Sequence, residues 1–301
     1  MPPKVKDGLK SGIQLGSFIL GEPLGQGGFG ITYNATHITL QQRVAIKEYL
    51  PMEIAERADN GVDVAPADEE YAEIYAKHLE GFVGEAVTLA RFKHPNIVRV
   101  QDVFEANGTA YMVMEFEGGD SLERILRNGQ ATGEPYILSI LHPLLDSLKA
   151  VHAAGFIHRD IKPDNIIVRP DGTPVLLDFG AARLAIGVDT RPLTVLMTKD
   201  YGPYEQYDWG TGKQGPWTDI YAMGATLYRV VSGKPPANAF SRNRARAAKQ
   251  ADPLAPAAEK AAEGYSKQFL SAIDAALAFL PDDRPQTLSA WQATIPPAVG
   301  R

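Results

Sequence analysis

Apolar and polar residues alternate in short runs through the first third of the chain, which is the pattern of half-buried strands. The last of these runs follows a turn at Asn107-Gly108. One segment, GFVGEAVTLARF, instead has helical spacing, with Phe82, Ala86 and Leu89 near one face. The pattern predicts an antiparallel sheet with one helix, and the strand-like runs are FIL, GITYNAT, RVAIKEYL, IVRVQDVFEA and TAYMVMEF.

After Gly118-Gly119 the pattern becomes helical. The clearest helix is predicted from Pro135 to Ala154, where an apolar stripe ends at Gly155. A second helix is predicted from Asp219 to Val231, and the Ala-rich, charged stretch from Arg242 to Glu263 suits either a helix or a loop. A sheet-rich first third followed by a helix-rich remainder predicts an α+β protein with two lobes.

The predicted boundaries follow from these changes of pattern. Residues 1–15 are rich in Lys, Gly and Pro without periodicity, so they are expected to form a flexible N-terminal lead-in. The first lobe is predicted at 16–116, the second at 117–295, and a short tail at 296–301.

Composition narrows the function classes. The chain has 301 residues, no cysteine and a formal net charge of −6, which excludes thiolate chemistry and cysteine-ligated metals and argues against nucleic acid as the main partner. The sequence contains no apolar run long enough to span a membrane and no secretory signal pattern at its start. We therefore expect a cytoplasmic chain without direct membrane insertion.

Two motifs in the first lobe carry candidate chemistry. Gly25 to Gly30 reads G-x-G-x-x-G between two strand-like runs, so its backbone amides could approach phosphates closely. An ordinary glycine-rich hairpin is the alternative, and a dinucleotide-binding turn would need a helix directly afterwards. Lys47 lies in Val-Ala-Ile-Lys and is expected to point into a cleft, whereas an exposed edge lysine is the common alternative.

Two later motifs favour the phosphate-binding interpretation of the first two. They are His158 to Asn165, which reads HRDIKPDN, and Asp178 to Gly180, which reads DFG. Together the four motifs resemble the signature set of eukaryotic-like (Hanks-type) protein kinases, in its bacterial Ser/Thr branch. The resemblance covers about Ser17 to Thr294. It implies a bilobal kinase fold with an antiparallel-sheet N-lobe, one regulatory helix and a mainly helical C-lobe.

The resemblance assigns roles around the phosphates. Lys47 is expected to bind the α- and β-phosphates of ATP, held by Glu85 on the regulatory helix. Glu80 and Glu73 are rivals for Glu85, because the family usually has a shorter segment here and an insertion is expected around residues 57–77.

The catalytic roles fall on the second lobe. Asp160 is expected to act as the catalytic base, and Lys162 resembles the lysine that Ser/Thr kinases place near the transferred phosphate. Asn165 and Asp178 are expected to coordinate Mg²⁺, with Mn²⁺ as the alternative ion.

The adenine pocket is expected to be apolar with backbone hydrogen bonds from the hinge. Met114 aligns with the gatekeeper, and Glu115 to Glu117 with the hinge. Thr32 departs from the valine that usually continues the glycine motif. The full set of residues expected to bind the nucleotide, besides Lys47, Glu85 and Asp178, is Leu24, Gly25, Gly27, Gly28, Gly30, Thr32, Ala45, Met114, Glu115, Glu117 and Ile167.

The segment after Asp178 resembles an activation loop. Autophosphorylation is expected at Thr190 or Thr194, where phosphate could pair with Arg159. Thr198 matches a threonine that contacts the catalytic loop in the family, so a structural role is expected there.

Other residues are expected to support the scaffold. His158 and Phe179 are assigned to packing, and Asp219 to bracing the catalytic loop. Glu205 and Arg284 match a buried ion pair of the family, although Thr-Lys-Asp and Gly-Pro-Tyr-Glu near this site depart from the usual motifs.

The sequence thus predicts a protein serine/threonine kinase that uses ATP. Its expected partners are protein substrates, including a second copy of itself in a transient dimer. A pseudokinase scaffold and a small-molecule kinase of related fold are the alternatives. The chain could also be the cytosolic domain of a longer, membrane-tethered protein.

Overall fold

The computed structural model describes residues 5–129, 133–178, 183–184, 200–207 and 214–298. The chain forms two compact units. One comprises the described residues up to His94 together with Val98–Glu117, and the other comprises Pro95–Ile97 and the described residues from Gly118 onward. Among the described residues, no helix is both long and apolar enough to cross a membrane.

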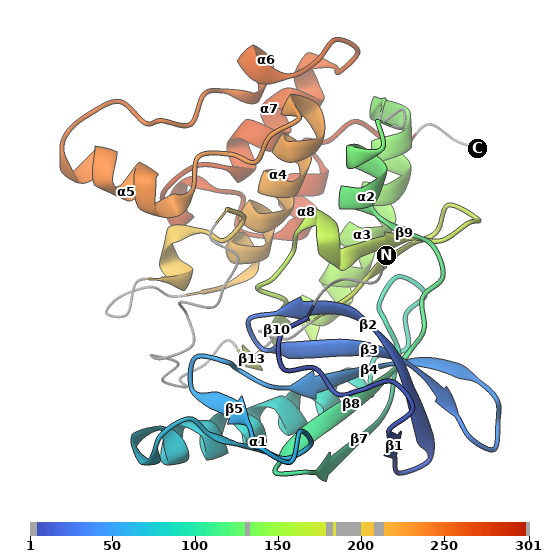
Figure 1. The fold of residues 1–301 in the computed structure, drawn as a ribbon. Helices are drawn as coiled ribbons and strands as arrows, with labels where there is room; N and C mark the ends of the chain where they lie inside the picture. Colours follow the sequence, from blue (N-terminus) through green and yellow to red (C-terminus); the bar gives the residue numbers. More distant parts are fainter. Residues whose placement is uncertain (1–4, 130–132, 179–182, 185–199, 208–213, 299–301) are drawn as a thin grey trace. The chain divides into compact units, whose positions relative to one another are not determined.

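The first unit is built on a six-stranded antiparallel sheet with the order β1-β2-β3-β4-β8-β7 (Figure 1). The strands that alternating apolar residues predicted are all present. The bounds are β1 Gln14–Leu15, β2 Phe18–Gly27, β3 Gly30–His37, β4 Arg43–Tyr49, β7 Val100–Ala106 and β8 Thr109–Glu115.

The helix of this unit, α1, spans Ala72–Leu89, whereas the sequence predicted a helix over 81–92. It starts earlier because Tyr75 and Phe82 both lie on its buried face and pack near the ring of Tyr49, with centroids 5.7 and 5.3 Å away. A short 3₁₀ turn, η1 Glu69–Tyr71, precedes it, and the Asp68 carboxylate caps that turn.

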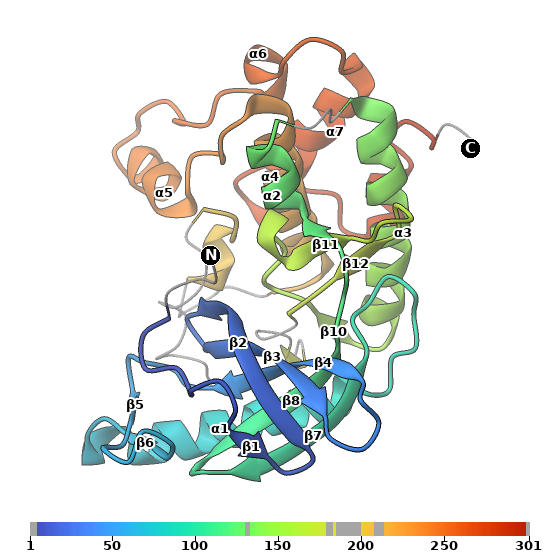
Figure 2. The same cartoon turned by 45° about the vertical axis from the view of Figure 1, so that its right-hand side comes forward.

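A hairpin formed by β5 Ala55–Arg57 and β6 Val64–Pro66 overlaps the start of the expected insertion (Figure 2). The Val64 amide donates to the Asn107 carbonyl at 2.8 Å. A Cβ on Gly108, whose φ is +70°, would lie 2.3 Å from the Val64 carbonyl oxygen. The hairpin is therefore packed against the β7–β8 turn, and the glycine there allows the close approach.

The structure differs from the flexible lead-in that the sequence predicted. Leu9 and Leu15 are each 4% exposed, and Gln14–Leu15 pairs with β2 as strand β1. The Leu9 amide donates to the Tyr33 hydroxyl at 2.9 Å. Residues 9–15 are too short for a periodic signal, so their burial depends on contacts with strands farther along the chain.

The second unit is mainly helical, as predicted, with short strands at its start. In the turned view of Figure 2, β11 and β12 lie side by side, and β9 pairs with β11. The strands are β9 Asp120–Ser121, β10 Phe156–Ile157, β11 Ile166–Val168, β12 Pro174–Leu176 and β13 Arg183–Leu184. The α-helices are α2 Leu122–Arg127, α3 Glu134–Ala153, α4 Pro216–Ser232, α5 Ala239–Ala247, α6 Ala257–Lys260, α7 Lys267–Ala276 and α8 Leu288–Gln292. The 3₁₀ turns are η2 Pro163–Asn165, η4 Tyr204–Gln206 and η5 Pro281–Asp283.

Helices α3, α4, α7 and α8 form the core of this unit. A Cβ on Gly224 of α4 would lie 2.7 Å from the Ala276 Cβ of α7, so these helices pack closely. Trp291 of α8 is fully buried and donates its indole N–H to the Ala272 carbonyl. Helices α3 and α4 match the two predicted helices, and the ambiguous charged stretch contains the end of α5 and all of α6.

Candidate active site

The glycine-rich motif forms the turn between β2 and β3, where Gly27 pairs with Gly30. Gly30 has φ of +148°, and a Cβ there would lie 1.8 Å from the Glu48 carbonyl oxygen, so this position requires glycine. Gly25 and Gly27 have no such restriction, because an added Cβ would find no described atom within 4 Å. Their missing side chains leave room for a ligand to approach the backbone closely.

Lys47 lies on β4 between Thr32 of β3 and Met112 of β8, and it is 7% exposed. This burial disfavours the alternative of a lysine on an exposed edge.

Three glutamates of α1 were candidates to hold Lys47. Glu85 is half-buried on the side of the helix that carries Phe82 and Leu89, at the i+3 and i−4 positions. Glu73 and Glu80 are exposed. Burial therefore favours Glu85 among the three.

The remaining nucleotide candidates of the first unit line its sheet. Ala45 and Met114 are neighbours on β4 and β8 and are 9% and 6% exposed. Leu24 on β2 is 42% exposed, and the Glu115 amide donates to the Arg99 carbonyl at 2.9 Å. Glu117 is half-buried, and Gly28 lies in the β2–β3 turn. Ile167 belongs to the second unit, on β11.

The second unit gathers three predicted catalytic residues into one hydrogen-bonded cluster. The Lys162 ammonium lies 3.0 and 2.8 Å from the two carboxylate oxygens of Asp160. The Asn165 amide donates to the Asp160 carbonyl at 2.8 Å and to its Oδ2 at 2.9 Å. The Asp160 and Lys162 side chains are each 20% exposed. The Asp160 carboxylate is thus oriented by two donors while solvent or a substrate can still reach it.

Asp219 braces this loop, as predicted. Its Oδ2 accepts from the His158 amide and its Oδ1 from the Arg159 amide, both at 2.9 Å, and His152 lies 2.7 Å from Oδ2. Burial alone would raise the pKa of Asp219, but the hydrogen bond and charge of His152 outweigh it and lower that pKa. A buried carboxylate thus stays ionised and holds two consecutive amides of the loop.

His158 is fully buried, in agreement with its predicted packing role. Its Nε2 lies 2.9 Å from the Leu177 carbonyl, which can only accept, and its Nδ1 lies 3.2 Å from the Asp160 amide, which can only donate. The ring is therefore neutral with its proton on Nε2. Burial lowers the pKa of His158 and supports the same assignment.

The candidate metal ligands are Asn165 and Asp178. Asn165 directs its amide nitrogen to Asp160, which leaves the hard oxygen Oδ1 as its ligand atom. The Leu177 amide donates to the Asn165 carbonyl at 2.8 Å, and Asp178 follows directly with φ of +52°. No group of three or more His, Asp or Glu residues suited to a metal occurs in the described part of the chain. One carboxylate and one amide fit Mg²⁺ that is also held by substrate phosphates.

The ion pair predicted between Glu205 and Arg284 is present and buried. Arg284 Nη1 and Nη2 lie 2.6 and 3.1 Å from the two Glu205 oxygens. The Arg284 guanidinium also donates to the Ala278, Phe279 and Trp217 carbonyls. This bidentate pair ties the η4 turn to the η5 turn, and η4 precedes α4 in the chain.

Several predicted residues lie outside the described part of the chain. They are Phe179, Gly180, Thr190, Thr194 and Thr198. Their assigned roles stay predictions.

Sequence reasoning missed some residues that support the site. Gln206 donates to the Arg159 carbonyl at 2.8 Å, and its position next to Glu205 was the available signal. His152 contacts Asp219 across 67 positions of sequence, and Arg57 pairs with Glu48 inside the first unit. Nothing local in the sequence marks the last two contacts.

Known proteins resemble this chain over most of its length. A protein kinase domain family model matches residues 18–294. Serine/threonine-protein kinase Pkn1 of Myxococcus xanthus is 31% identical over 96% of this chain and 39% of its own. Serine/threonine-protein kinase PknA of Mycobacterium tuberculosis is 34% identical over 73% of this chain and 48% of its own. The chain thus spans less than half the length of these curated relatives.

A solved structure gives the same result for the fold. The chain described as PpkA-294 apo form is 36% identical, with a TM-score of 0.79 over 97% of this chain and 100% of that one. The α+β kinase fold expected from the four motifs is therefore confirmed. Members of this family use ATP and a divalent metal ion, and the chain belongs to the protein kinase domain family, in its bacterial Hanks-type branch.

Proposed function

We propose that this chain transfers the γ-phosphoryl group of ATP to serine or threonine hydroxyls of proteins. The observation that carries the proposal is the Asp160, Lys162 and Asn165 cluster, in which both Lys162 and Asn165 donate to the Asp160 carboxylate. The names of the curated relatives support Ser/Thr specificity. The buried Glu205 and Arg284 pair supports a protein substrate, because a small substrate does not need the docking surface of an activation segment.

Asp160 orients the substrate hydroxyl and takes its proton. The hydroxyl oxygen then forms a bond to the γ-phosphorus while the bond from that phosphorus to the β,γ-bridging oxygen breaks, and ADP leaves. Lys162 neutralises charge on the transferred group from its place beside Asp160. A strongly raised pKa is not needed at Asp160, because the transition state of phosphoryl transfer is loose.

The nucleotide is held by Lys47 and the glycine-rich turn, with Glu85 positioning Lys47. Asn165 and Asp178 hold Mg²⁺, which neutralises phosphate charge when it is bound. Ala45, Met114 and Ile167 contribute apolar surface for the adenine.

Regulation follows from the same assignment. Phosphate on Thr190 or Thr194 pairs with Arg159, which precedes the catalytic aspartate. Autophosphorylation between two copies requires a transient dimer, so its rate should rise with protein concentration. A cytoplasmic location belongs to the same proposal.

Labelled ATP with a generic protein substrate tests the proposal. Wild type should place label on serine and threonine, whereas Lys47→Met and Asp160→Asn should lose at least about 100-fold of the rate. Lys77→Met and Asp59→Asn make the same substitutions at exposed positions of the first unit, and they should keep wild-type activity.

Each alternative gives its own result. A pseudokinase scaffold would give no label with any variant. A small-molecule kinase would consume ATP without labelling protein. Either result would overturn the proposal.

A further inference from the structure

The segment Val5–Leu9, here termed the strap, is hydrogen-bonded to the glycine-rich turn. The Lys6 amide donates to Gln26 Oε1 at 3.0 Å, and Gln26 Nε2 donates back to the Lys6 carbonyl at 2.9 Å. Gln26 is the residue between Gly25 and Gly27 of the motif. Its side chain therefore connects the strap to the turn proposed to cover the nucleotide phosphates.

The strap is also attached farther along its length. The Asp7 carbonyl accepts from Arg57 Nε at 2.6 Å, and Arg57 belongs to the inserted hairpin, on strand β5. Arg57 also donates to the Val62 carbonyl at 2.7 Å and pairs with Glu48 Oε2 at 2.6 Å. The Arg57 and Glu48 side chains are 5% and 0% exposed, so this pair is buried, although the hydrogen bond from Arg57 to the strap is exposed, like the contact at Gln26.

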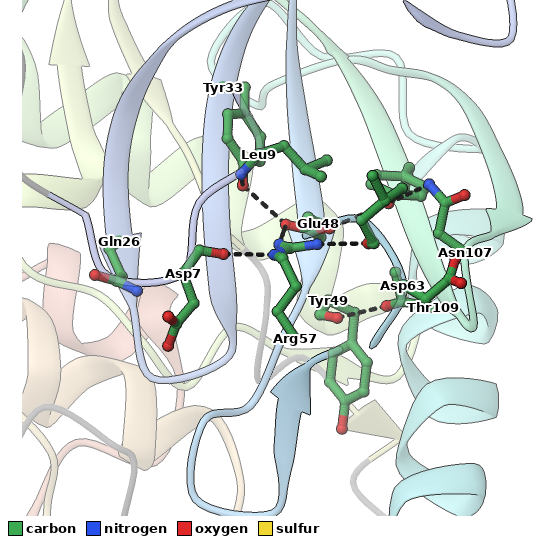
Figure 3. A network of polar contacts seen from close by, with 12 residues as sticks. Asp7, Leu9, Gln26, Tyr33, Glu48, Tyr49, Arg57, Asp63, Asn107 and Thr109 are labelled. Atoms are coloured by element: carbon green, nitrogen blue, oxygen red, sulfur yellow. Dashed lines mark hydrogen bonds and ion pairs between the residues drawn. The ribbon is translucent and has the colours of Figure 1, made fainter. Parts of the chain in front are cut away.

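Glu48 extends the network to three strands of the sheet (Figure 3). Its Oε2 accepts from the Tyr33 hydroxyl at 2.9 Å, and its Oε1 from the Tyr111 hydroxyl at 3.1 Å. Tyr33 in turn accepts from the Leu9 amide at the end of the strap. Burial and the Glu48 charge raise the pKa of Tyr33, so that hydroxyl remains a donor to the carboxylate.

The strand that carries Glu48 also contacts the other end of the glycine-rich turn. Gly30 pairs with Tyr49 of β4, and the Leu50 amide donates to the Phe29 carbonyl at 3.1 Å. The turn is therefore held on both sides, by Gln26 through the strap and by the β4 backbone next to Gly30. The network connects both contacts through Arg57.

We infer that the strap, with Gln26 and Arg57 as positioning residues, holds the glycine-rich turn in the arrangement that binds ATP. The inference rests on the proposed function, since it assumes that this turn covers the nucleotide. Gly25 and Gly27 have no described side-chain neighbours that would restrict them, and glycine loses more conformational freedom on ordering than any other residue. Holding the turn beforehand lowers the cost of ordering it when ATP binds.

A pair of substitutions at Lys6 isolates the contact. Lys6→Pro removes the amide donor to Gln26, whereas Lys6→Ala keeps both backbone groups and removes only the exposed side chain. Gln26→Leu removes both hydrogen bonds to Lys6, and the weak contact of Gln26 Nε2 with Met52 Sδ at 3.4 Å, with a side chain of similar size. Gln42→Leu, at an exposed position between β3 and β4, is the matched control for that change.

The measurements are ATP KM and kcat, with amide hydrogen exchange of Gly27 to Gly30 followed without nucleotide. Two exposed hydrogen bonds predict a KM roughly three- to tenfold higher in Lys6→Pro and Gln26→Leu, with a smaller change in kcat. Lys6→Ala and Gln42→Leu should stay within twofold of wild type. The amides of Gly27 to Gly30 should exchange faster in Lys6→Pro than in Lys6→Ala, and the ATP KM should rise in the same variant.

The outcomes separate the two proposals. An unchanged KM and unchanged exchange in Lys6→Pro, with active wild type, would overturn the positioning role and leave the proposed function intact. Inactive wild type would overturn the proposed function, and exchange alone would then decide whether the strap holds the turn. A lower melting temperature with unchanged KM and exchange would show a structural role only and would also overturn the inference.

Discussion

Replacing Arg284 with alanine should destabilise the second unit far more than removing an exposed arginine. All five N–H donors of the guanidinium have acceptors, two on Glu205 and three on backbone carbonyls. Arg284 and Glu205 are 3% and 2% exposed. Arg284→Ala leaves a buried carboxylate without its cation, which costs about 3–5 kcal/mol. At about 2–4 °C per kcal/mol for a unit of this size, the melting temperature should fall by about 6–20 °C.

Thermal and urea unfolding followed by circular dichroism would measure this loss. Arg124→Ala is the matched control, because Arg124 pairs with Asp120 at 3.2 Å but its side chain is 70% exposed, so the loss should stay below about 1 kcal/mol. Arg284→Lys should fall between the two, since lysine offers three donors to five acceptors. Replacing both charges, as Glu205→Gln with Arg284→Met, should recover part of the loss. Equal stabilities for Arg284→Ala and Arg124→Ala would refute this reasoning.

Three further predictions concern the glycine turn and the catalytic loop. Gly30→Ala should lower the free energy of unfolding in urea by at least about 2 kcal/mol, because its Cβ would collide with backbone. Gly25→Ala should keep the stability of wild type and weaken ATP binding in calorimetry. A larger loss of stability in Gly25→Ala than in Gly30→Ala would contradict the roles given to the two glycines. The pKa of His158 is lowered in the folded state. As the pH falls below 6.5, the usual pKa of histidine, His158 is therefore protonated in the unfolded chain before it is protonated in the folded one. Stability should then fall by up to about 1.4 kcal/mol per pH unit, and His158→Gln should remove this dependence in unfolding measured from pH 7 to 5. Asp219→Asn should lower kcat more than it raises ATP KM, because it loosens the His158 and Arg159 amides rather than the nucleotide turn; an unchanged kcat would argue against bracing.

The sequence alone determined the main elements and predicted the chemistry of the site. Short apolar runs predicted the strands β2, β3, β4, β7 and β8. Burial alternates in β2 and β3, as for a strand with one exposed face, whereas β4 and β8 are buried at nearly every residue. The resemblance of four local motifs to the kinase signature set predicted the roles of Lys47, Asp160, Asn165 and Asp178, and these residue types suit the charge neutralisation that phosphoryl transfer needs.

Only the tertiary structure decided which segments far apart in the chain contact one another. The burial of Leu9, the early start of α1 at Ala72 and the Arg57–Glu48 pair depend on contacts between segments that are far apart in the chain. Charged residues such as Arg57 and Glu48 are usually exposed, so their types predicted solvent exposure rather than a buried pair. Periodicity reports which face of an element is apolar, but a partner for a buried charge is chosen only when the strands and the inserted hairpin meet.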